Sequence, residues 1–454
     1  MTVKIPGFTG QISTTGPEFD AAVATWNRAR RHRPAVVAHC NGAEDVAAAV
    51  KYARASGLRV SARSGGHGYT GAAIAGNGVV IDLRGMRAVD YDADTGEVTV
   101  GAGARWADVD DVLGPHGRAT AAGSVSKVGV AGFSLGTGAG WLSRTIGTAG
   151  DLLTRATVVT ADGSVLVVSP SVHPDLYWAL RGGTGSFGIV TEFTFETVPI
   201  RTVLAGPVVY RLDDARGVLR RLVDTAAGLD RRASWAALLT CAPPLPSVPG
   251  DMVGTSALLL PLLWVGDPEE GERHLAPLRQ LTEPVADLVQ SMPFSAFQRS
   301  SDDAAPDGMC WDVRSEWLDG LDGADIDAAV ASAASAVSPL SQVLLRLVGG
   351  RLADQPATPF SFPHARYLLE VIASWAPGED EEPAREWMRS TWQALRHRSA
   401  GGPCVSHIGI GESADRVAAA YSPEVMSRLR DIKRRYDPDD FFSSAPHIPP
   451  ADSH

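Results

Sequence analysis

The glycine-dense segment 123–150 (GSVSKVGVAGFSLGTGAGWLSRTIGTAG) limits the folds open to this 454-residue chain more than any other stretch. Glycine at such density is typical of a backbone that approaches another group closely or adopts positive φ. A second glycine stretch, RVSARSGGHGYTG at 59–71, begins as a strand and runs into Gly65, Gly66 and His67. Two adjacent glycines allow main-chain N–H groups to turn toward an anion such as a pyrophosphate, with His67 at the mouth of the loop. Taken alone, a histidine after two glycines is also typical of a surface loop.

Two shorter glycine motifs match known patterns in the wrong structural context. Residues 183–188 (GTGSFG) fit GxGxxG, which binds dinucleotides when a strand precedes the glycines and a helix follows them. Here the order is reversed, so a Rossmann site is not expected. Residues 132–136 (GFSLG) fit the GxSxG nucleophile elbow, but Ser134 lies inside a long glycine tract instead of at one sharp turn. A hydrolase with His407 as base is therefore a minor alternative.

Apolar periodicity predicts helices and strands throughout the chain. We expect helices at 19–33, 43–56, 107–113, 172–181, 325–338 and 422–441, the last with a stop at Asp437-Pro438. We expect strands at 59–63, 78–83, 97–103, 203–212, 257–265 and 366–375. A hairpin is expected around Asp162-Gly163. After Pro199 the glycine loops give way to a segment richer in Pro, Leu and acidic residues, which predicts a separate, substrate-facing lobe.

Composition argues against several classes of protein. The net charge of −11 and the pI near 5.5 give little support to a nucleic-acid partner. The longest apolar run, at 257–265, is interrupted by Pro261 and too short to span a bilayer, so no membrane partner is expected. The four cysteines are widely scattered without metal-type spacing, which predicts reduced thiols and no metal site. The N-terminus lacks the apolar core of a secretory signal, so we expect a cytoplasmic enzyme.

Five ordered blocks carry a resemblance to a known family: RPAVVAHCNGAEDVAAAVKYARASGLRVSARSGGHGYTG, NGVVIDLRGM, VGVAGFSLGTGAGWLSRTIGTAGDLL, HPDLYWALRGGTGSFGIVTEFTF and RLRDIKRRYDPDDFF. They resemble the FAD-linked oxidases of the vanillyl-alcohol-oxidase (VAO) fold, in the berberine-bridge-enzyme-like branch. The resemblance implies an α+β protein with a PCMH/VAO-type FAD-binding domain of two α/β subdomains, plus an α/β substrate domain built on an antiparallel sheet. The expected bounds are 1–200 for the first part of the FAD-binding domain, 201–403 for the substrate-binding domain and 404–454 for the C-terminal return to the FAD-binding domain.

The resemblance also implies how the flavin is held. In this family the histidine of the GGH block is bonded to the flavin 8α-methyl carbon, and here that residue is His67. Many members add a second bond from a cysteine, but the matching position here is Val125, so FAD is expected to be covalent through His67 only. The resemblance places the remaining flavin contacts, mostly main-chain donors, at Ser64, Gly65, Gly66, Gly68, Gly123, Ser124, Val128, Gly129, Val130, Gly132, Gly136, Gly138, Gly183, Gly188 and Val190.

The sequence offers four candidates for the catalytic base. Relatives often carry a Tyr-x-Asn pattern before the closing helix, where this chain reads PCVSHIGIGESADRVAAAY. His407 stands roughly where that pattern would begin, and a packed strand-end histidine is an equally good interpretation. Glu370 is a second candidate, since a carboxylate desolvated in an apolar strand would have a raised pKa. Tyr69 and Tyr421 rank third.

The resemblance implies an oxidase that oxidises a hydroxyl or similar group by hydride transfer to flavin N5, with dioxygen as the final electron acceptor. The substrate is expected to be a small organic molecule of secondary metabolism, acted on by a monomer or homodimer. Three alternatives stay open: an FAD-dependent dehydrogenase, a biosynthetic cyclase or oxygenase, and a flavoprotein that only sequesters a ligand.

Overall fold

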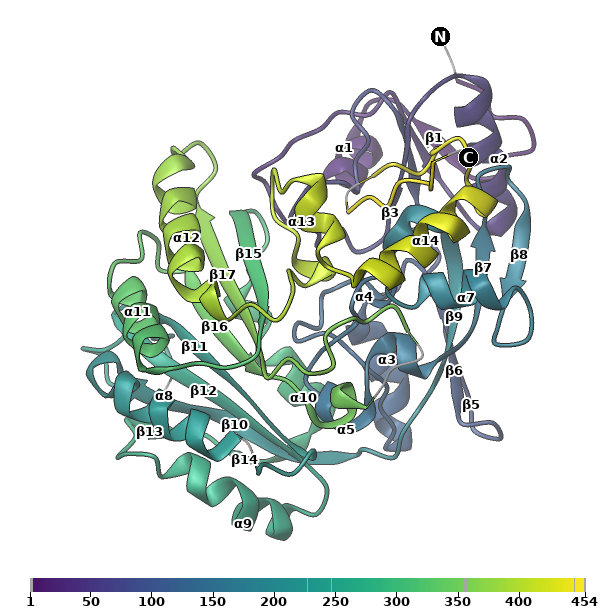
Figure 1. Cartoon of the computed structure of the whole chain (residues 1–454). Helices are drawn as coiled ribbons and strands as arrows, with labels where there is room; N and C mark the ends of the chain where they lie inside the picture. The colour runs from purple at the N-terminus through teal and green to yellow at the C-terminus, as the bar shows by residue number, and fades with distance from the viewer. Residues whose placement is uncertain (1–2, 227, 246, 355–357, 445, 453–454) are drawn as a thin grey trace.

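The computed structural model of the protein describes residues 3–226, 228–245, 247–354, 358–444 and 446–452. Its chain is organised around three sheets (Figure 1). The first has the order β1-β2-β4-β3, in which β2, β4 and β3 are parallel and β1 is antiparallel. Its strands are β1 (Gln11–Ser13), β2 (Val36–His39), β3 (Val60–Arg63) and β4 (Val79–Asp82). Strand β3 leads directly into the Gly65-Gly66-His67 loop.

The second sheet is antiparallel, with the order β5-β6-β9-β7-β8. Its strands are β5 (Val89–Asp92), β6 (Glu97–Gly101), β7 (Leu153–Val159), β8 (Val165–Val168) and β9 (Ile189–Glu196). Helix α2 (Ala43–Ala55) packs on strands of both sheets, and its buried Val46, Ala49, Val50 and Ala53 join them into one core. The predicted hairpin is confirmed, with Gly163 at φ 77°.

The third sheet has eight antiparallel strands in the order β13-β10-β12-β11-β16-β17-β15, with β14 paired to β10. Its strands are β10 (Thr202–Arg211), β11 (Ala233–Cys241), β12 (Ser256–Val265), β13 (Ala286–Asp287), β14 (Gln290–Pro293), β15 (Cys310–Leu318), β16 (Gln342–Leu347) and β17 (Tyr367–Trp375). Helices α8 (Leu212–Ala226), α9 (Pro268–Arg279), α11 (Gly323–Ala334) and α12 (Glu382–Leu395) cover its outer face (Figure 1). The other face is turned toward the glycine-rich part of the chain.

Shorter helices and turns complete the structure. The remaining α-helices are α1 (Pro17–Val23), α3 (Trp106–Leu113), α4 (Val130–Leu135), α5 (Ser143–Ile146), α6 (Ala149–Leu152), α7 (Pro174–Leu180), α10 (Phe294–Arg299), α13 (Ala414–Ala418) and α14 (Pro423–Tyr436). The 3₁₀ turns are η1 (Gly114–His116), η2 (Thr184–Phe187), η3 (Asp302–Ala304), η4 (Gly350–Ala353), η5 (Arg396–Arg398) and η6 (Val405–His407). No helix in the described ranges has both the length and the apolarity needed to cross a bilayer. All four cysteines are free thiols, as predicted.

The helix expected at 19–33 is wrong beyond Val23, where α1 ends. The chain does not continue as a helix because the Asn27 side chain makes tertiary hydrogen bonds. Its Nδ2 donates to the carbonyl oxygens of Tyr69 (2.7 Å) and Trp311 (2.9 Å). These tertiary bonds outweigh the local helix preference. The arginines at 28–33 therefore line no helix face, and Arg30 instead pairs with Glu381 of the substrate-side lobe at 2.9 Å.

The closing helix α14 carries a fully buried cation. Lys433 Nζ donates to the carbonyl oxygens of Ser186 (2.8 Å) and Phe442 (2.9 Å) and to Asp437 Oδ2 (2.6 Å). Both Lys433 and Asp437 have fully buried side chains. The cation therefore ties the end of the chain to η2, beside the glycine-rich segments.

We expect Lys433→Met to cost roughly 3–5 kcal/mol in the free energy of unfolding, because it leaves the Asp437 carboxylate buried without its cation. Arg435→Met is the matched control, since Arg435 lies on the same helix, 70% exposed, and pairs with Asp175 at 2.7 Å. An exposed pair of this kind contributes about 0–1 kcal/mol. Urea unfolding midpoints of the two variants measure the difference, and equal midpoints would contradict the assignment.

Candidate active site

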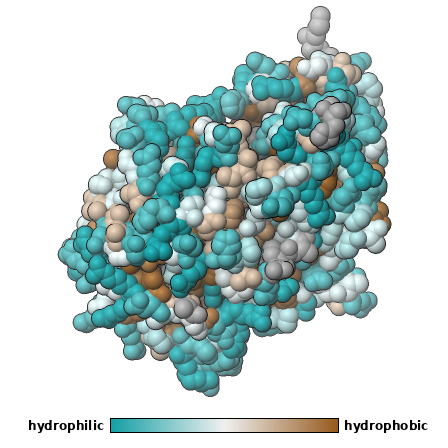
Figure 2. All heavy atoms as spheres, in the orientation of Figure 1, coloured by the Kyte–Doolittle hydropathy of each residue, from teal (hydrophilic) through white to brown (hydrophobic). Residues whose placement is uncertain are grey.

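A cavity of about 500 Å³ lies between the glycine-rich segments and the uncovered face of the eight-stranded sheet. Its floor is formed by the loop after β3 and by parts of segments 123–144 and 184–190. Its roof is formed by side chains of the eight-stranded sheet: Ser234, Leu238, Pro261, Trp311, Trp317, Gln342, Leu344, Arg346, Leu347, Leu368, Glu370 and Ile372. On the face seen in Figure 2 the surface is mostly hydrophilic, and apolar residues gather along the middle, between the two halves.

Strand pleating decides which roof residues face the cavity. In β16, Leu344 and Arg346 line the cavity, whereas Val343 and Leu345 belong to the core under the outer helices. Strand β17 alternates in the same way, with Glu370 on the cavity side. This period of two follows from strand geometry, in which successive side chains point to opposite faces.

Main-chain packing in the floor requires glycine. A Cβ atom at Gly129 would lie 2.5 Å from the nitrogen of Gly65, so the two loops touch backbone to backbone. By contrast, a Cβ atom at Gly68, Gly132 or Gly185 would meet no atom within 4 Å. All five glycines line the cavity, and the last three face open space within it. The floor therefore offers main chain without side chains along a roomy cavity, which fits a long ligand such as FAD.

Most residues predicted to contact the flavin line this cavity. They are Ser64, Gly65, Gly66, His67, Gly68, Gly123, Ser124, Val125, Val128, Gly129, Gly132, Gly136, Gly188 and Val190. Val130, Gly138 and Gly183 lie behind the lining: Val130 is buried in the core, and a Cβ atom at Gly138 or Gly183 would meet Ala149 or Leu429. These three residues support the floor from outside the cavity.

His67 stacks on an aromatic side chain at the cavity wall. Its ring lies 5.3 Å from that of Trp26 at an interplanar angle of 15°, and Trp26 in turn stacks on Trp311 at 5.0 Å. Burial lowers the pKa of His67 to about 4, against the opposing effect of Asp307. The imidazole is therefore neutral at pH 7, the state in which a ring nitrogen can form a covalent bond to carbon.

The two leading base candidates form one ion pair. His407 Nδ1 lies 3.0 Å from Glu370 Oε1, and Arg346 Nε donates to Glu370 Oε2 at 2.6 Å. The Glu370 side chain is only 2% exposed, whereas those of His407 and Arg346 are 27% and 25% exposed. Arg346 Nη1 also donates to Ser124 Oγ in the floor at 2.9 Å. The Glu370 carboxylate is thus paired with two basic side chains, His407 and Arg346, and both of these line the cavity.

The expectation of a raised pKa for Glu370 is wrong. Burial alone would raise that pKa, but His407 and Arg346 outweigh burial and hold it below its usual value. In turn, burial alone would lower the pKa of His407, as does the nearby Arg346, but the Glu370 carboxylate and, after it, Cys404 raise it to about 9. Glu370 is therefore ionised at neutral pH, and His407 is a stronger base than a free imidazole.

The two tyrosine candidates are separated. Tyr69 lines the cavity beside His407, with ring centroids 6.2 Å apart, and burial raises the pKa of its hydroxyl. Tyr421 does not line this cavity, and its hydroxyl donates to the Gly182 carbonyl oxygen at 2.8 Å. The structure thus brings three of the four candidates, Tyr69, Glu370 and His407, to one wall.

Two features of the site were not predicted from the sequence: Arg346 and the stacking of Trp26 on His67. A lone cation in the apolar strand QVLLRL was the available signal for Arg346, because strand alternation places it on the same face as Gln342 and Leu344. Trp26 falls within the helix predicted at 19–33, but α1 ends before it at Val23.

The ion pair makes stability depend on pH. The folded-state pKa of His407, about 9, lies above the usual value of 6.5. Its stabilising contribution is therefore complete below about pH 6.5 and is lost as pH rises through about 9. We expect the Tm advantage of wild type over His407→Gln to be largest near pH 6 and to vanish near pH 9.5. A Tm difference that stays constant across that range would contradict the pairing.

The fold and the cavity define the class of protein: an FAD-dependent oxidoreductase of the VAO type. Residues 34–169 match the family described as "FAD binding domain", and residues 398–449 match the family described as "Berberine and berberine like". The (R)-6-hydroxynicotine oxidase of Paenarthrobacter nicotinovorans is 31% identical over 96% of this chain and 95% of its own length. The chain belongs to the berberine-bridge-enzyme-like FAD-linked oxidoreductases.

Solved structures agree with this assignment. The 6-hydroxy-D-nicotine oxidase of Arthrobacter nicotinovorans superimposes with a TM-score of 0.86 at 27% identity, covering 98% of both chains. The xylooligosaccharide oxidase of Myceliophthora thermophila, in complex with xylobiose, gives a TM-score of 0.85 at 23% identity over 98% of both chains, a likeness of fold.

Proposed function

We propose that the protein is an oxidase that removes hydride from a carbon bearing a hydroxyl or similar group in a small organic substrate. FAD, when bound, supplies the hydride acceptor, and dioxygen takes the electrons and is released as hydrogen peroxide. Residues 1–200 and 404–454 would hold the flavin, and residues 201–403 would supply the substrate side. In this proposal FAD is covalently attached through His67 alone.

The observation that carries the proposal is the Glu370–His407 ion pair in the cavity wall. A buried carboxylate lies 3.0 Å from His407 Nδ1, where it can stabilise the imidazolium that forms. The contact is an ion pair without hydrogen-bond geometry, and the partly exposed His407 ring also lines the cavity. We infer that a substrate hydroxyl gives its proton to His407 and that Glu370 stabilises the resulting charge.

The roof suggests which substrates fit. Leu238, Leu344, Leu368, Ile372 and Trp311 make most of the sheet side of the cavity apolar. An aromatic or otherwise apolar molecule with one hydroxyl near the ion pair fits this wall better than a long sugar chain does. (R)-6-hydroxynicotine is a direct probe because a relative named for that activity shares 31% identity along nearly the whole chain.

The test is turnover of (R)-6-hydroxynicotine, benzylic alcohols and a xylooligosaccharide, with peroxide yield measured against substrate consumed. Equal amounts of peroxide and product support an oxidase. Anaerobic flavin reduction followed by slow reaction with oxygen would instead identify a dehydrogenase. Binding of every probe without flavin reduction would contradict the proposal and would indicate a protein that only sequesters a ligand.

The pH profile identifies the base. If His407 is the base, kcat/KM should rise about tenfold per pH unit and level off near pH 9, because only neutral imidazole accepts a proton. If ionised Glu370 accepts the proton directly, the profile should stay flat from pH 6 to 8, because its pKa lies below its usual value.

A further inference from the structure

His407 lies on a segment that has no regular secondary structure beyond the short turn η6. This segment, residues 400–410, runs along β15, the last strand of the eight-stranded sheet. At its start the backbone pairs with Trp317: Ala400 N donates to the Trp317 carbonyl oxygen at 2.7 Å, and Trp317 N donates to the Gly402 carbonyl oxygen at 2.9 Å. Farther along, side chains of β15 hold it. The position of a base on such a segment therefore depends on these contacts with β15.

Two side chains of β15 bracket His407. Before it, Ser315 Oγ accepts from Cys404 N at 3.1 Å and donates to the His407 carbonyl oxygen at 3.1 Å. After it, Asp312 Oδ1 accepts from Ile410 N at 2.7 Å. The main chain on both sides of His407 is thereby fixed to the sheet whose next strand, β17, carries Glu370.

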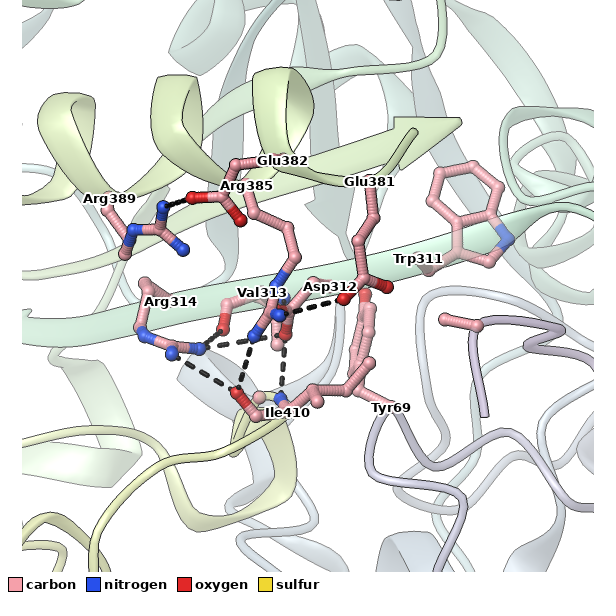
Figure 3. Close-up of polar contacts among 12 residues, drawn as sticks. Tyr69, Trp311, Asp312, Val313, Arg314, Glu381, Glu382, Arg385, Arg389 and Ile410 are labelled. Atoms are coloured by element: carbon pink, nitrogen blue, oxygen red, sulfur yellow. Dashed lines mark hydrogen bonds and ion pairs between the residues drawn. The ribbon is translucent and has the colours of Figure 1, made fainter. Parts of the chain in front are cut away.

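Asp312 is itself held from the helix side. Its side chain is fully buried, and Arg385 of α12 donates from Nε to Asp312 Oδ2 at 2.9 Å (Figure 3). Arg385 also donates to the Ile410 carbonyl oxygen at 3.2 Å, as does Arg314 at 3.2 Å. Thus the Asp312 carboxylate binds the main-chain N–H of Ile410, and the guanidinium groups of Arg385 and Arg314 bind its carbonyl oxygen.

Packing leaves the segment no room to shift. A Cβ atom at Gly409 would overlap the Val313 carbonyl oxygen and would lie 2.6 Å from Asp312 Oδ1. The segment therefore sits against the strand at main-chain distance, and any side chain at 409 would push it away from β15.

We propose that Asp312 is a positioning residue of the active site, which sets the distance between His407 and Glu370 through its bond to Ile410 N. This inference rests on the proposed role of the ion pair as the catalytic base. Asp312 touches neither the cavity nor the flavin floor, and it acts through the segment that it holds.

The pKa of His407 depends on its distance from the Glu370 carboxylate and can be measured without a substrate. NMR on holoenzyme with ¹³C-labelled histidine gives this pKa. The His407 signal is assigned by its absence in His407→Gln. We expect a pKa of about 9 in wild type, and a fall of at least one pH unit in Asp312→Ala, which removes the acceptor of the Ile410 N–H. Gly409→Ala should produce a similar fall, because it displaces the segment without adding or removing a charged group.

Glu316 provides the matched control. It lies on the same strand with a fully buried side chain, and it accepts from Trp392 Nε1 at 3.1 Å and pairs with Arg416 at 3.0 Å. Glu316→Gln should leave the pKa of His407 unchanged, since none of its contacts reaches Ile410.

The outcomes separate the two claims. A wild-type His407 that titrates at or below its usual pKa would overturn the ion pair as base and the proposed function with it. A wild-type pKa near 9 that survives both Asp312→Ala and Gly409→Ala would overturn only the positioning role. A fall in Asp312→Ala alone would show a direct charge effect, and an equal fall in Glu316→Gln would show general loosening; either result would also overturn it.

Discussion

His67→Ala is expected to release all of its flavin on acid precipitation, while wild-type protein keeps the yellow colour in the pellet. The reason is that His67 is the residue at the cavity wall whose neutral ring nitrogen is available for a bond to the flavin, since burial lowers its pKa to about 4. Absorbance of the supernatant and fluorescence of the pellet measure the two fractions.

Val125→Cys is the companion variant. Val125 lines the same cavity, and a thiol there restores the position from which many relatives form a second bond. We expect the double variant His67→Ala/Val125→Cys to regain acid-stable flavin in part. Flavin that remains in the His67→Ala pellet would show that another residue of the wild-type chain holds it.

Glu370→Gln is expected to lower the rate of anaerobic flavin reduction by roughly 10²–10⁴-fold, with the flavin content unchanged. Glutamine has nearly the same shape as glutamate, but it carries no charge to stabilise an imidazolium. Burial then prevails and lowers the pKa of His407, so the plateau of the pH profile should move from about 9 to lower pH. Stopped-flow absorbance of the flavin, with the best substrate of the turnover screen, measures both effects.

Two controls make the result specific. Glu316→Gln removes an equally buried carboxylate from a neighbouring strand and should leave the reduction rate within a few-fold of wild type. His407→Gln should be at least as slow as Glu370→Gln, and the double variant should be little slower than either, because residues that act as a unit are not additive. A fast His407→Gln variant would remove the histidine from the mechanism and leave Glu370 as the direct base.

Much of the flavin half was predictable because its constraints are local. The floor consists of glycines that are consecutive or nearly so, and the need for main-chain approach can be inferred from the residue type itself. Helix α2 and the hairpin at Gly163 follow from periodicity and turn chemistry for the same reason.

The roof was not predictable to the same degree because its constraints are tertiary. Glu370 and His407 are distant in sequence and become a pair only because β17 and the segment after α12 are neighbours in space. The direction of the Glu370 pKa shift depends on that pairing, so burial alone gave the wrong sign. The end of α1 also depends on a distant contact, the bonds of Asn27 to Tyr69 and Trp311.

The alternation along β16 and β17 has a consequence for engineering and for divergence. Leu344, Leu368 and Ile372 can change in size without altering the helix-side core, since the sheet backbone separates the two sets of side chains. These three residues are buried in smaller clusters on the cavity side, so a combinatorial library at these positions should yield new substrate ranges with a stability cost confined to that side. By the same logic, gene duplicates of such a protein could acquire new substrates through changes in the roof alone, while the floor that we propose for the flavin stays unchanged.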